Sequence, residues 1–238
     1  MINILIPAMG NSVFFEKYYF PKLMIEINGE TVLEKVINNF CQIKERHFIF
    51  VLSEKECNEF HTDNGVKLLT GGNCSIIRLK NETAGGLCTS LIAVEHINND
   101  DPLIVANFDQ IIDVNYQEVV DTFNAGGYDA GVISFKSIHP RWSYLRLDGD
   151  EVIELAEKCP ISKNAIAGFY YFRHGSDFVE GAKRAIRKES SLNGRYYISS
   201  SMNELILMER RIGMYAIDKD AYHSFYSPDK IKEYEKTV

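Results

Sequence analysis

The sequence predicts an α/β fold with a doubly wound, mostly parallel mixed sheet and a small antiparallel hairpin region. Apolar runs of strand length alternate with helical patterns along most of the 238 residues, and this alternation is typical of a parallel sheet with helices on both faces. Asp148-Gly149-Asp150 separates two strand-like runs, and Asp-Gly suits the tight turn of an antiparallel hairpin. Since no linker, repeat or charge block divides the chain, we expect a single domain over residues 1–238.

The elements of the first half follow from apolar spacing. The clearest helix begins after Thr31, which forms a capping box with Glu34 ahead of apolar residues that repeat at helical spacing as far as Phe40. Expected strands are 3–6, 47–52, 75–79, 103–106 and 129–135, and expected helices are 32–40, 87–97 and 116–123.

In the second half the hairpin comes first. It pairs 142–147 with 151–156, and a strand at 165–172, a helix at 176–188 and a strand at 212–217 follow. Ser201 and Glu204 have the spacing of a second capping box, which predicts a helix from there to about Arg210. Ser227-Pro228-Asp229 predicts a last helix, with Ser as the cap and Pro at the first helical position.

Composition and charge exclude several classes of protein. The 26 Lys+Arg against 33 Asp+Glu give a net charge of −7, which argues against general nucleic-acid binding because that requires a basic surface. No apolar run approaches the length of a membrane span. The first residues show neither a basic region nor a cleavage site of a signal peptide, so we expect a cytoplasmic protein. A small-molecule ligand is the default expectation.

Two loops directly after expected strands could carry chemistry, since ligands of open α/β sheets bind beyond the carboxyl ends of the strands. Residues 7–12 contain small residues whose backbone amides could face a phosphate, although a plain strand-to-helix turn is also compatible with them. Asn107-Phe108-Asp109-Gln110 puts a carboxylate just past a buried strand. Asp109 could hold Mg²⁺ together with a bound polyphosphate, or it could cap a turn.

Two further segments contain groups suited to anions. Pro21-Lys22 precedes the first helix, and its lysine is either a functional cation or a solvated surface residue. Residues 82–87 form a small-residue turn that leads into a helix N-terminus. Such a turn can lie against a flat base or an anion, or it can simply allow tight helix packing.

The order and spacing of these four segments resemble the nucleotidyltransferase family that makes sugar nucleotides from an NTP and a sugar 1-phosphate. The second half also resembles the family pattern, and the resemblance spans nearly the whole chain. The chain is most similar in style to bacterial capsule and surface-polysaccharide nucleotidyltransferases, which carry an Asn-x-Asp-Gln form of the metal loop. The matching segments of the second half are Trp142-Ser143-Tyr144 with Val152, Glu157-Lys158, residues 167–172, Tyr196-Tyr197 ahead of residues 203–206, and Ser227-Pro228-Asp229.

The resemblance implies the Rossmann-like fold of nucleotide-diphospho-sugar transferases, with residues 1–135 mainly binding the nucleotide and 136–238 mainly binding the acceptor. It implies that a phosphate oxygen of the acceptor attacks the α-phosphorus of an NTP, and that pyrophosphate leaves. On this pattern Asp109 would hold Mg²⁺, Lys22 would stabilise the developing charge, and Lys158 would meet the acceptor phosphate. The implied nucleotide-binding residues are Pro7, Ala8, Met9, Gly10, Asn11, Ser12, Glu82, Thr83, Ala84, Gly85 and Asn107. The implied acceptor-binding residues are Glu157, Lys158, Gly168, Tyr197 and Asn203.

The chain departs from the family pattern in two places. The first loop lacks the arginine that grips the nucleotide phosphates, so Lys17 or loop amides would have to replace it. The second metal-holding acid aligns with Ser224, and Asp218 on the late strand is the nearby alternative, so Asp109 and Asp218 are the expected metal ligands.

We therefore expect a Mg²⁺-dependent nucleotidyltransferase, with CTP as the first candidate nucleotide, that serves capsule or surface-polysaccharide biosynthesis. The acceptor could be a sugar 1-phosphate, phosphocholine or phosphoglutamine, and a homodimer is left open. A metal-dependent glycosyltransferase and a non-catalytic nucleotide-sensing relative are the alternatives.

Overall fold

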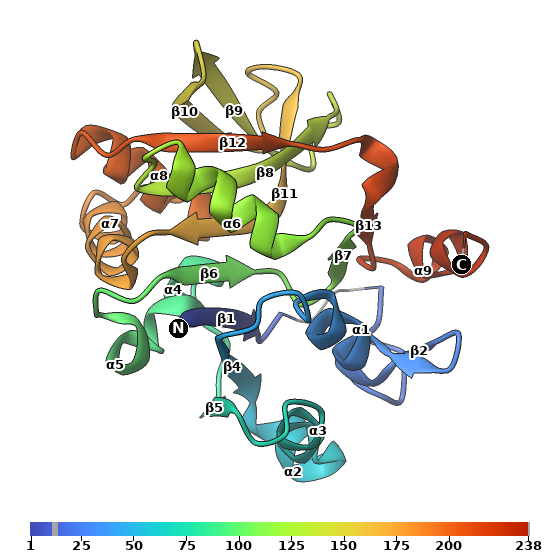
Figure 1. The fold of residues 1–238 in the computed structure, drawn as a ribbon. Coiled ribbons are helices and arrows are strands. Elements are labelled where there is room, and N and C mark those ends of the chain that lie inside the picture. Colours follow the sequence, from blue (N-terminus) through green and yellow to red (C-terminus); the bar gives the residue numbers. More distant parts are fainter. Residues whose placement is uncertain (11–13, 238) are drawn as a thin grey trace.

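The computed structural model describes residues 1–10 and 14–237, so Asn11 and Ser12 of the expected nucleotide loop lie outside the described residues. One sheet of nine strands passes through both halves of the chain in the order β5-β4-β1-β6-β11-β8-β12-β10-β9 (Figure 1). The strands are β1 (Ile2–Ala8), β4 (Arg46–Ser53), β5 (Cys74–Leu79), β6 (Leu103–Ala106), β8 (Ala130–Lys136), β9 (Ser143–Asp148), β10 (Glu151–Glu157), β11 (Asn164–Phe172) and β12 (Ile212–Ala216).

The sheet is mixed, and one end of it closes into a ring. Strands β1, β4, β5 and β6 pair in parallel, as do β8 and β12, whereas β10 and β11 run against the other seven strands. Strand β11 pairs with β6 and β8 and also with β9, so β11, β8, β12, β10 and β9 form a closed circuit. The α/β class and the mixed sheet agree with the prediction, but a plain, open, doubly wound sheet does not describe this ring.

Gly168 is the point at which β11 bends to close the ring. The pairing of β11 with β8 shifts register between Ile166 and Tyr170, and Gly168 has a φ of +62°, which glycine adopts without steric cost. Before the bulge, Asn164 and Ala165 pair with β9. After it, residues 169–172 pair with β6.

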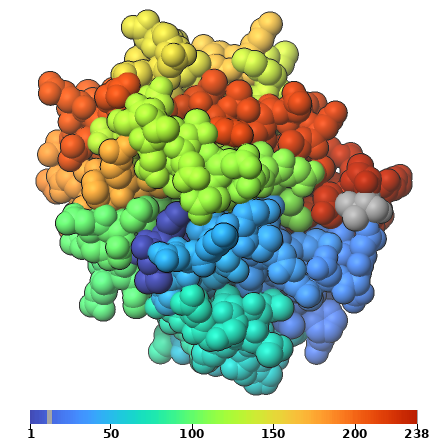
Figure 2. Space-filling view, viewed as in Figure 1, coloured from blue at the N-terminus to red at the C-terminus, as the bar shows by residue number. Residues whose placement is uncertain are grey.

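Helices cover both faces of the sheet and enclose two apolar cores. Helices α1 (Val32–Asn39), α2 (Glu54–Phe60), α3 (Thr62–Leu69) and α6 (Tyr116–Ala125) contribute to one core. Helices α4 (Gly86–Leu91), α5 (Val94–Ile97), α7 (Gly175–Arg187) and α8 (Ile198–Leu207) contribute to the other. In Figure 2 the N-terminal half of the chain gathers on one side of the molecule and the C-terminal half on the opposite side. None of the helices that the structure describes has the length and apolarity needed to cross a membrane.

Short elements connect the sheet to the C-terminal segment. Strand β2 (Glu26–Ile27) pairs with β3 (Glu30–Thr31), and β7 (Gln110–Ile112) pairs with β13 (Tyr222–Ser224). Two 3₁₀ helices, η1 (Lys22–Met24) and η2 (Lys219–Ala221), precede β2 and β13. Helix α9 (Pro228–Glu235) follows β13 and lies beside it (Figure 1).

Several local expectations are confirmed and two are wrong. The Thr31 hydroxyl accepts a hydrogen bond from Glu34 N at 3.1 Å, as a capping residue does. Ser201 does not cap a helix, because α8 already begins at Ile198, and the Ser201 hydroxyl instead donates to Ile198 O at 2.7 Å. The single helix expected over 87–97 is divided into α4 and α5.

Candidate active site

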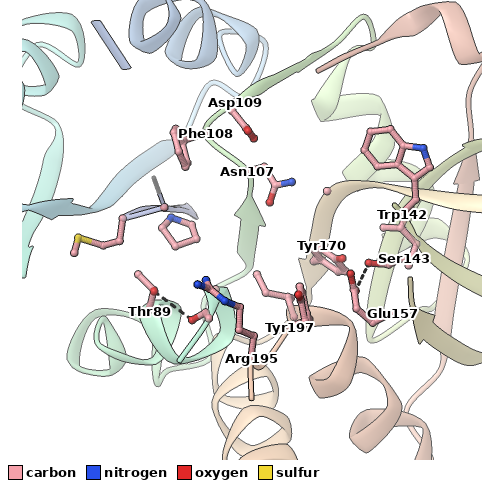
Figure 3. Close-up of a pocket in the computed structure, with 18 of the residues that line it drawn as sticks. Thr89, Asn107, Phe108, Asp109, Trp142, Ser143, Glu157, Tyr170, Arg195 and Tyr197 are labelled. Atoms are coloured by element: carbon pink, nitrogen blue, oxygen red, sulfur yellow. Dashed lines mark hydrogen bonds between the residues drawn. The ribbon is translucent and has the colours of Figure 1, made fainter. Parts of the chain in front are cut away.

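A cavity of about 370 Å³ lies where β1, β6 and the bulge of β11 meet. Its walls come from loops of both halves of the chain (Figure 3). The predicted site residues that line it are Pro7, Met9, Gly10, Glu82, Thr83, Gly85, Asn107, Asp109, Glu157, Lys158, Gly168 and Tyr197. The structure therefore brings together most of the residues that the sequence analysis selected from segments far apart in the chain.

Asp109, which lines this cavity, forms an ion pair with Lys22, which does not line it. Lys22 Nζ donates to Asp109 Oδ2 at 2.5 Å, and the exposed fractions of the two side chains are 7% and 23%. The ammonium also lies 5.1 Å and 5.4 Å from the ring centroids of Phe15 and Phe108, within the range of cation–π attraction. Lys22 is therefore a buried, oriented cation rather than a solvated surface residue.

The turn before α4 is fixed to the segment before α8. Gly85 has a φ of +116°, and a Cβ there would collide with the backbone of Tyr196. The Tyr196 N–H donates to Ala84 O at 2.7 Å, and Leu87 N–H donates to Tyr196 O at 3.2 Å. Only a glycine allows this approach, so the small-residue turn serves contact with Tyr196 as well as lining the cavity.

Arg195 is a cavity cation that the sequence analysis missed. Asn193 and Gly194 have φ values of 53° and 72° and lie between Leu192 and Arg195, which form a β-bridge, as in a tight hairpin turn of the Asn-Gly kind. The side chain reaches the cavity beside Thr89 (Figure 3). Within residues 1–10 and 14–237 no side-chain partner of Arg195 is found. The Asn-Gly pair in the sequence was the signal that could have identified this turn.

Glu157 and Lys158 lie at the end of β10. Glu157 Oε2 accepts hydrogen bonds from Ser143 and, at 3.1 Å, from Ser199. Burial raises the pKa of Glu157, and the two serine hydrogen bonds and the charge of Lys158 oppose that rise. Lys158 has a φ of 52°, and its ammonium donates to the Tyr197 hydroxyl at 3.0 Å.

Among the described residues, five that were predicted for the site do not line the cavity, and Lys22 is one of them, since it reaches the site only through its ion pair with Asp109. Both polar atoms of the Asn203 side chain bond the backbone of Leu155, at 2.8 Å each, and so join α8 to β10. Ala8 is buried in the core, and Ala84 is exposed, with its carbonyl bonded to Tyr196. Asp218 is exposed ahead of η2.

The carboxylates of Glu82, Asp109 and Glu157 line the cavity but do not gather into a metal-binding cluster. In the described part of the chain no three His, Cys, Asp or Glu side chains cluster so as to hold a metal ion. Ser224 is paired with Gln110, next to Asp109, whereas Asp218 precedes η2. A single carboxylate such as that of Asp109 fits Mg²⁺ that takes its other ligands from phosphate and water, because Mg²⁺ is commonly bound in this way.

Arg141 and Trp142 form part of the cavity wall that the sequence analysis left without a role. The Arg141 guanidinium carbon lies 4.8 Å from the Trp142 ring centroid and 3.2 Å from that of Tyr226. A hydrogen bond from Arg141 is the main cause that lowers the pKa of Tyr226. Tyr170 and Tyr222 complete this aromatic wall.

No protein-family model matches the sequence, and no curated protein matches it. Solved structures do match. A nucleoside-diphosphate-sugar pyrophosphorylase of Vibrio cholerae superposes with a TM-score of 0.84 at 24% identity, over 99% of this chain and 100% of its own. A Bacillus anthracis protein described as a putative glucose-1-phosphate thymidylyltransferase superposes with a TM-score of 0.81 at 15% identity, over 100% of this chain and 95% of its own. HddC of Yersinia pseudotuberculosis superposes with a TM-score of 0.72 at 16% identity, over 100% of this chain and 99% of its own. The chain thus has the fold of the sugar-phosphate nucleotidyltransferases, along its whole length.

Proposed function

We propose that this protein is a nucleotidyltransferase that joins an NTP to a phosphorylated small molecule and releases pyrophosphate. One observation carries the proposal: cationic side chains line the cavity, and a further buried cation is paired with the carboxylate at its wall. Lys22 is paired with Asp109, which lines the cavity, and Lys158 and Arg195 line the cavity themselves. A reaction between two phosphate groups needs positive charge on both of them, so this distribution supports the proposal.

In the proposed step an oxygen of the acceptor phosphate forms a bond to the α-phosphorus of the NTP. The bond from that phosphorus to the bridging oxygen breaks, and the electron pair leaves with pyrophosphate. Lys22 would stabilise the negative charge that develops on the α-phosphate and the leaving group. Because its ammonium is buried and held in place, its charge is less screened than that of a solvated lysine.

Mg²⁺, which Asp109 would hold against the α-phosphate, would neutralise phosphate charge when bound. Asp109 is also the partner of Lys22, so this carboxylate fixes the orientation of the lysine before any ligand arrives. The metal requirement is part of the proposal, and we propose Asp109 as its carboxylate ligand, since Asp218, the second ligand expected from the sequence, does not line the cavity.

The two halves of the cavity would bind different substrates. Met9, Gly10 and the turn at 82–86 would surround the base and sugar of the NTP, with residues 1–135 as the nucleotide half. Lys158 and Arg195 would bind the phosphate of the acceptor, and the buried Glu157 would bind a polar group beyond it, with residues 136–238 as the acceptor half. Arg195 supplies a phosphate-binding guanidinium, although from a different segment than the first-loop arginine of the family.

A pyrophosphate-release assay tests the proposal. The purified protein with Mg²⁺ is offered each of four NTPs against sugar 1-phosphates, phosphocholine and phosphoglutamine, and we expect release with one nucleotide, CTP first, and one acceptor. Absence of pyrophosphate from every combination would refute the proposed activity. Release of a nucleoside diphosphate from a nucleotide sugar would instead indicate a glycosyltransferase. A role in capsule or surface-polysaccharide assembly predicts that deletion of the coding sequence alters that polymer.

A further inference from the structure

Gln110 is a buried side chain that lies behind the cavity wall, next in the chain to Asp109. Its exposed fraction is 4%, and it begins β7, directly after the Asp109 carboxylate. Its Nε2 donates to Ala167 O at 2.6 Å and to Gly168 O at 3.0 Å. Its Oε1 accepts from Asn107 Nδ2 at 3.3 Å and from the Tyr222 hydroxyl at 3.2 Å. One carboxamide therefore joins three segments that are distant in the sequence.

An amide is the side-chain group that satisfies all four contacts. The carbonyl oxygens of Ala167 and Gly168 accept hydrogen bonds and cannot donate them, so the NH₂ of Gln110 must face them, and its carbonyl oxygen then faces the two donors. A carboxylate at this position would put negative charge against two carbonyl oxygens and would lose both donors. Leaving such buried groups without partners is costly.

The same contacts fix the loop that carries Asp109. Asn107 N–H donates to Gly168 O at 3.1 Å, and Phe225 N–H donates to Asp109 O at 2.7 Å. A Cβ at Gly168 would collide with both Asn107 and Gln110. The loop of residues 107–109 is thus held from β11 on one side and from the segment after β13 on the other, with Gln110 in the middle.

We propose that Gln110 is a positioning residue, which sets the place of the Asp109 carboxylate relative to Lys22 and to the acceptor half of the cavity. This inference rests on the proposed function for its kinetic consequence, but its geometric consequence is independent of it. Gln110 does not line the cavity and acts through Asp109. Loss of the four contacts would let the loop shift, and a shift of about 1 Å in a catalytic group can lower turnover about a hundredfold.

The test uses two variants that keep the length of the side chain. Gln110→Glu removes the two hydrogen-bond donors, and Gln110→Met removes all four hydrogen bonds of the carboxamide. Gln117→Glu on the first turn of α6 makes the same charge change away from the cavity and is the matched control. With the substrate pair found in the pyrophosphate assay, we expect both Gln110 variants to lower kcat about a hundredfold per folded molecule. We expect KM for the NTP to change little and the control to keep wild-type kinetics. A merely structural role would reduce the yield of folded protein and leave kcat per folded molecule unchanged, which would overturn the inference.

Crystal structures of the wild type and of Gln110→Glu decide the geometric part even if no pyrophosphate is ever detected. In the wild type we expect the contacts Lys22 Nζ–Asp109 Oδ2 and Asn107 N–Gly168 O to be present. In the variant we expect both to exceed hydrogen-bonding distance, about 3.5 Å, with the fold unchanged. A variant that folds and keeps both contacts would overturn the inference. Failure of the assay with the wild type would refute the proposed function alone.

Discussion

Removing either member of the ion pair of Lys22 and Asp109 should lower the free energy of unfolding by a different amount, because the two side chains differ in exposure. The Lys22 side chain is 7% exposed and that of Asp109 is 23% exposed. Asp109→Ala leaves a buried ammonium without its carboxylate, and breaking a buried pair in this way costs about 3 kcal/mol of unfolding free energy. Lys22→Met keeps the apolar contacts of the lysine stem and leaves a carboxylate that water can reach, so we expect a loss of about 1 kcal/mol.

Urea denaturation of the two single variants and the double variant Lys22→Met/Asp109→Ala measures this asymmetry. We expect the double variant to be more stable than Asp109→Ala alone, because it no longer buries an unpaired charge. In the pyrophosphate assay both Lys22→Met and Asp109→Ala should lower turnover at least about a hundredfold. Equal destabilisation by the two single changes, with no recovery in the double variant, would refute the reasoning about the pair. Retained activity in either single variant would refute its assigned role.

Three further predictions concern the rest of the cavity. Gly168→Ala puts a Cβ on a residue with positive φ, where it collides with Asn107 and Gln110, so thermal unfolding should show that the free energy of unfolding falls by at least about 1 kcal/mol. Gly149→Ala, in the hairpin turn where a Cβ meets no atom, is the control and should lower the free energy of unfolding by less. Equal losses in the two variants would argue against the collision. Burial raises the pKa of Glu157 above its usual 4.5, so the wild type loses stability as Glu157 ionises with rising pH. Glu157→Gln has no such ionisation, and its stability relative to the wild type should therefore increase from pH 4 to pH 7. A difference in stability that does not depend on pH would contradict this. Trp142 is the one tryptophan of the chain and lines the part of the cavity that we propose binds the acceptor, so its fluorescence should change when the true acceptor is added. An unchanged fluorescence spectrum with an acceptor that the enzyme turns over would place that acceptor elsewhere.

Local signals in the sequence predicted the elements that local interactions determine. The capping box at Thr31 and the Asp-Gly turn at 149 need only neighbouring residues, and both are found in the structure. The Ser201 box fails because burial of Ile198, Met202 and Leu205 against the second core starts α8 one turn earlier. Helices α2 and α3 were not predicted, because each is short and has too few apolar residues to show a helical repeat.

The closure of the sheet could not be predicted, because it depends on pairings between distant segments. The glycine at 168 was selected as an acceptor-binding residue from the family resemblance, but its bend decides which strands β11 meets. Arg195 was missed for a similar reason: the Asn-Gly turn that presents it is local, while the cavity that it faces is formed by segments about a hundred residues away. Sequence patterns selected residues that line the cavity and missed Arg195, whose place there comes only from its neighbours in space.

The net charge of −7 and an anionic ligand are compatible once the positions of the charges are considered. Charges outside the cavity act on a bound phosphate through water and are screened over about 8 Å at physiological salt, so the total charge says little about one site. At the cavity wall Asp109 is paired with the buried, oriented ammonium of Lys22, and Arg195, which lines the cavity, has no counter-ion in the described part of the chain. A long polyanion would need an extended basic surface, which the excess of acidic residues argues against, whereas a triphosphate needs a few placed cations. Raising the ionic strength should therefore weaken NTP binding only slightly, and a steep salt dependence of KM would show that surface charge, and not the cavity, holds the nucleotide.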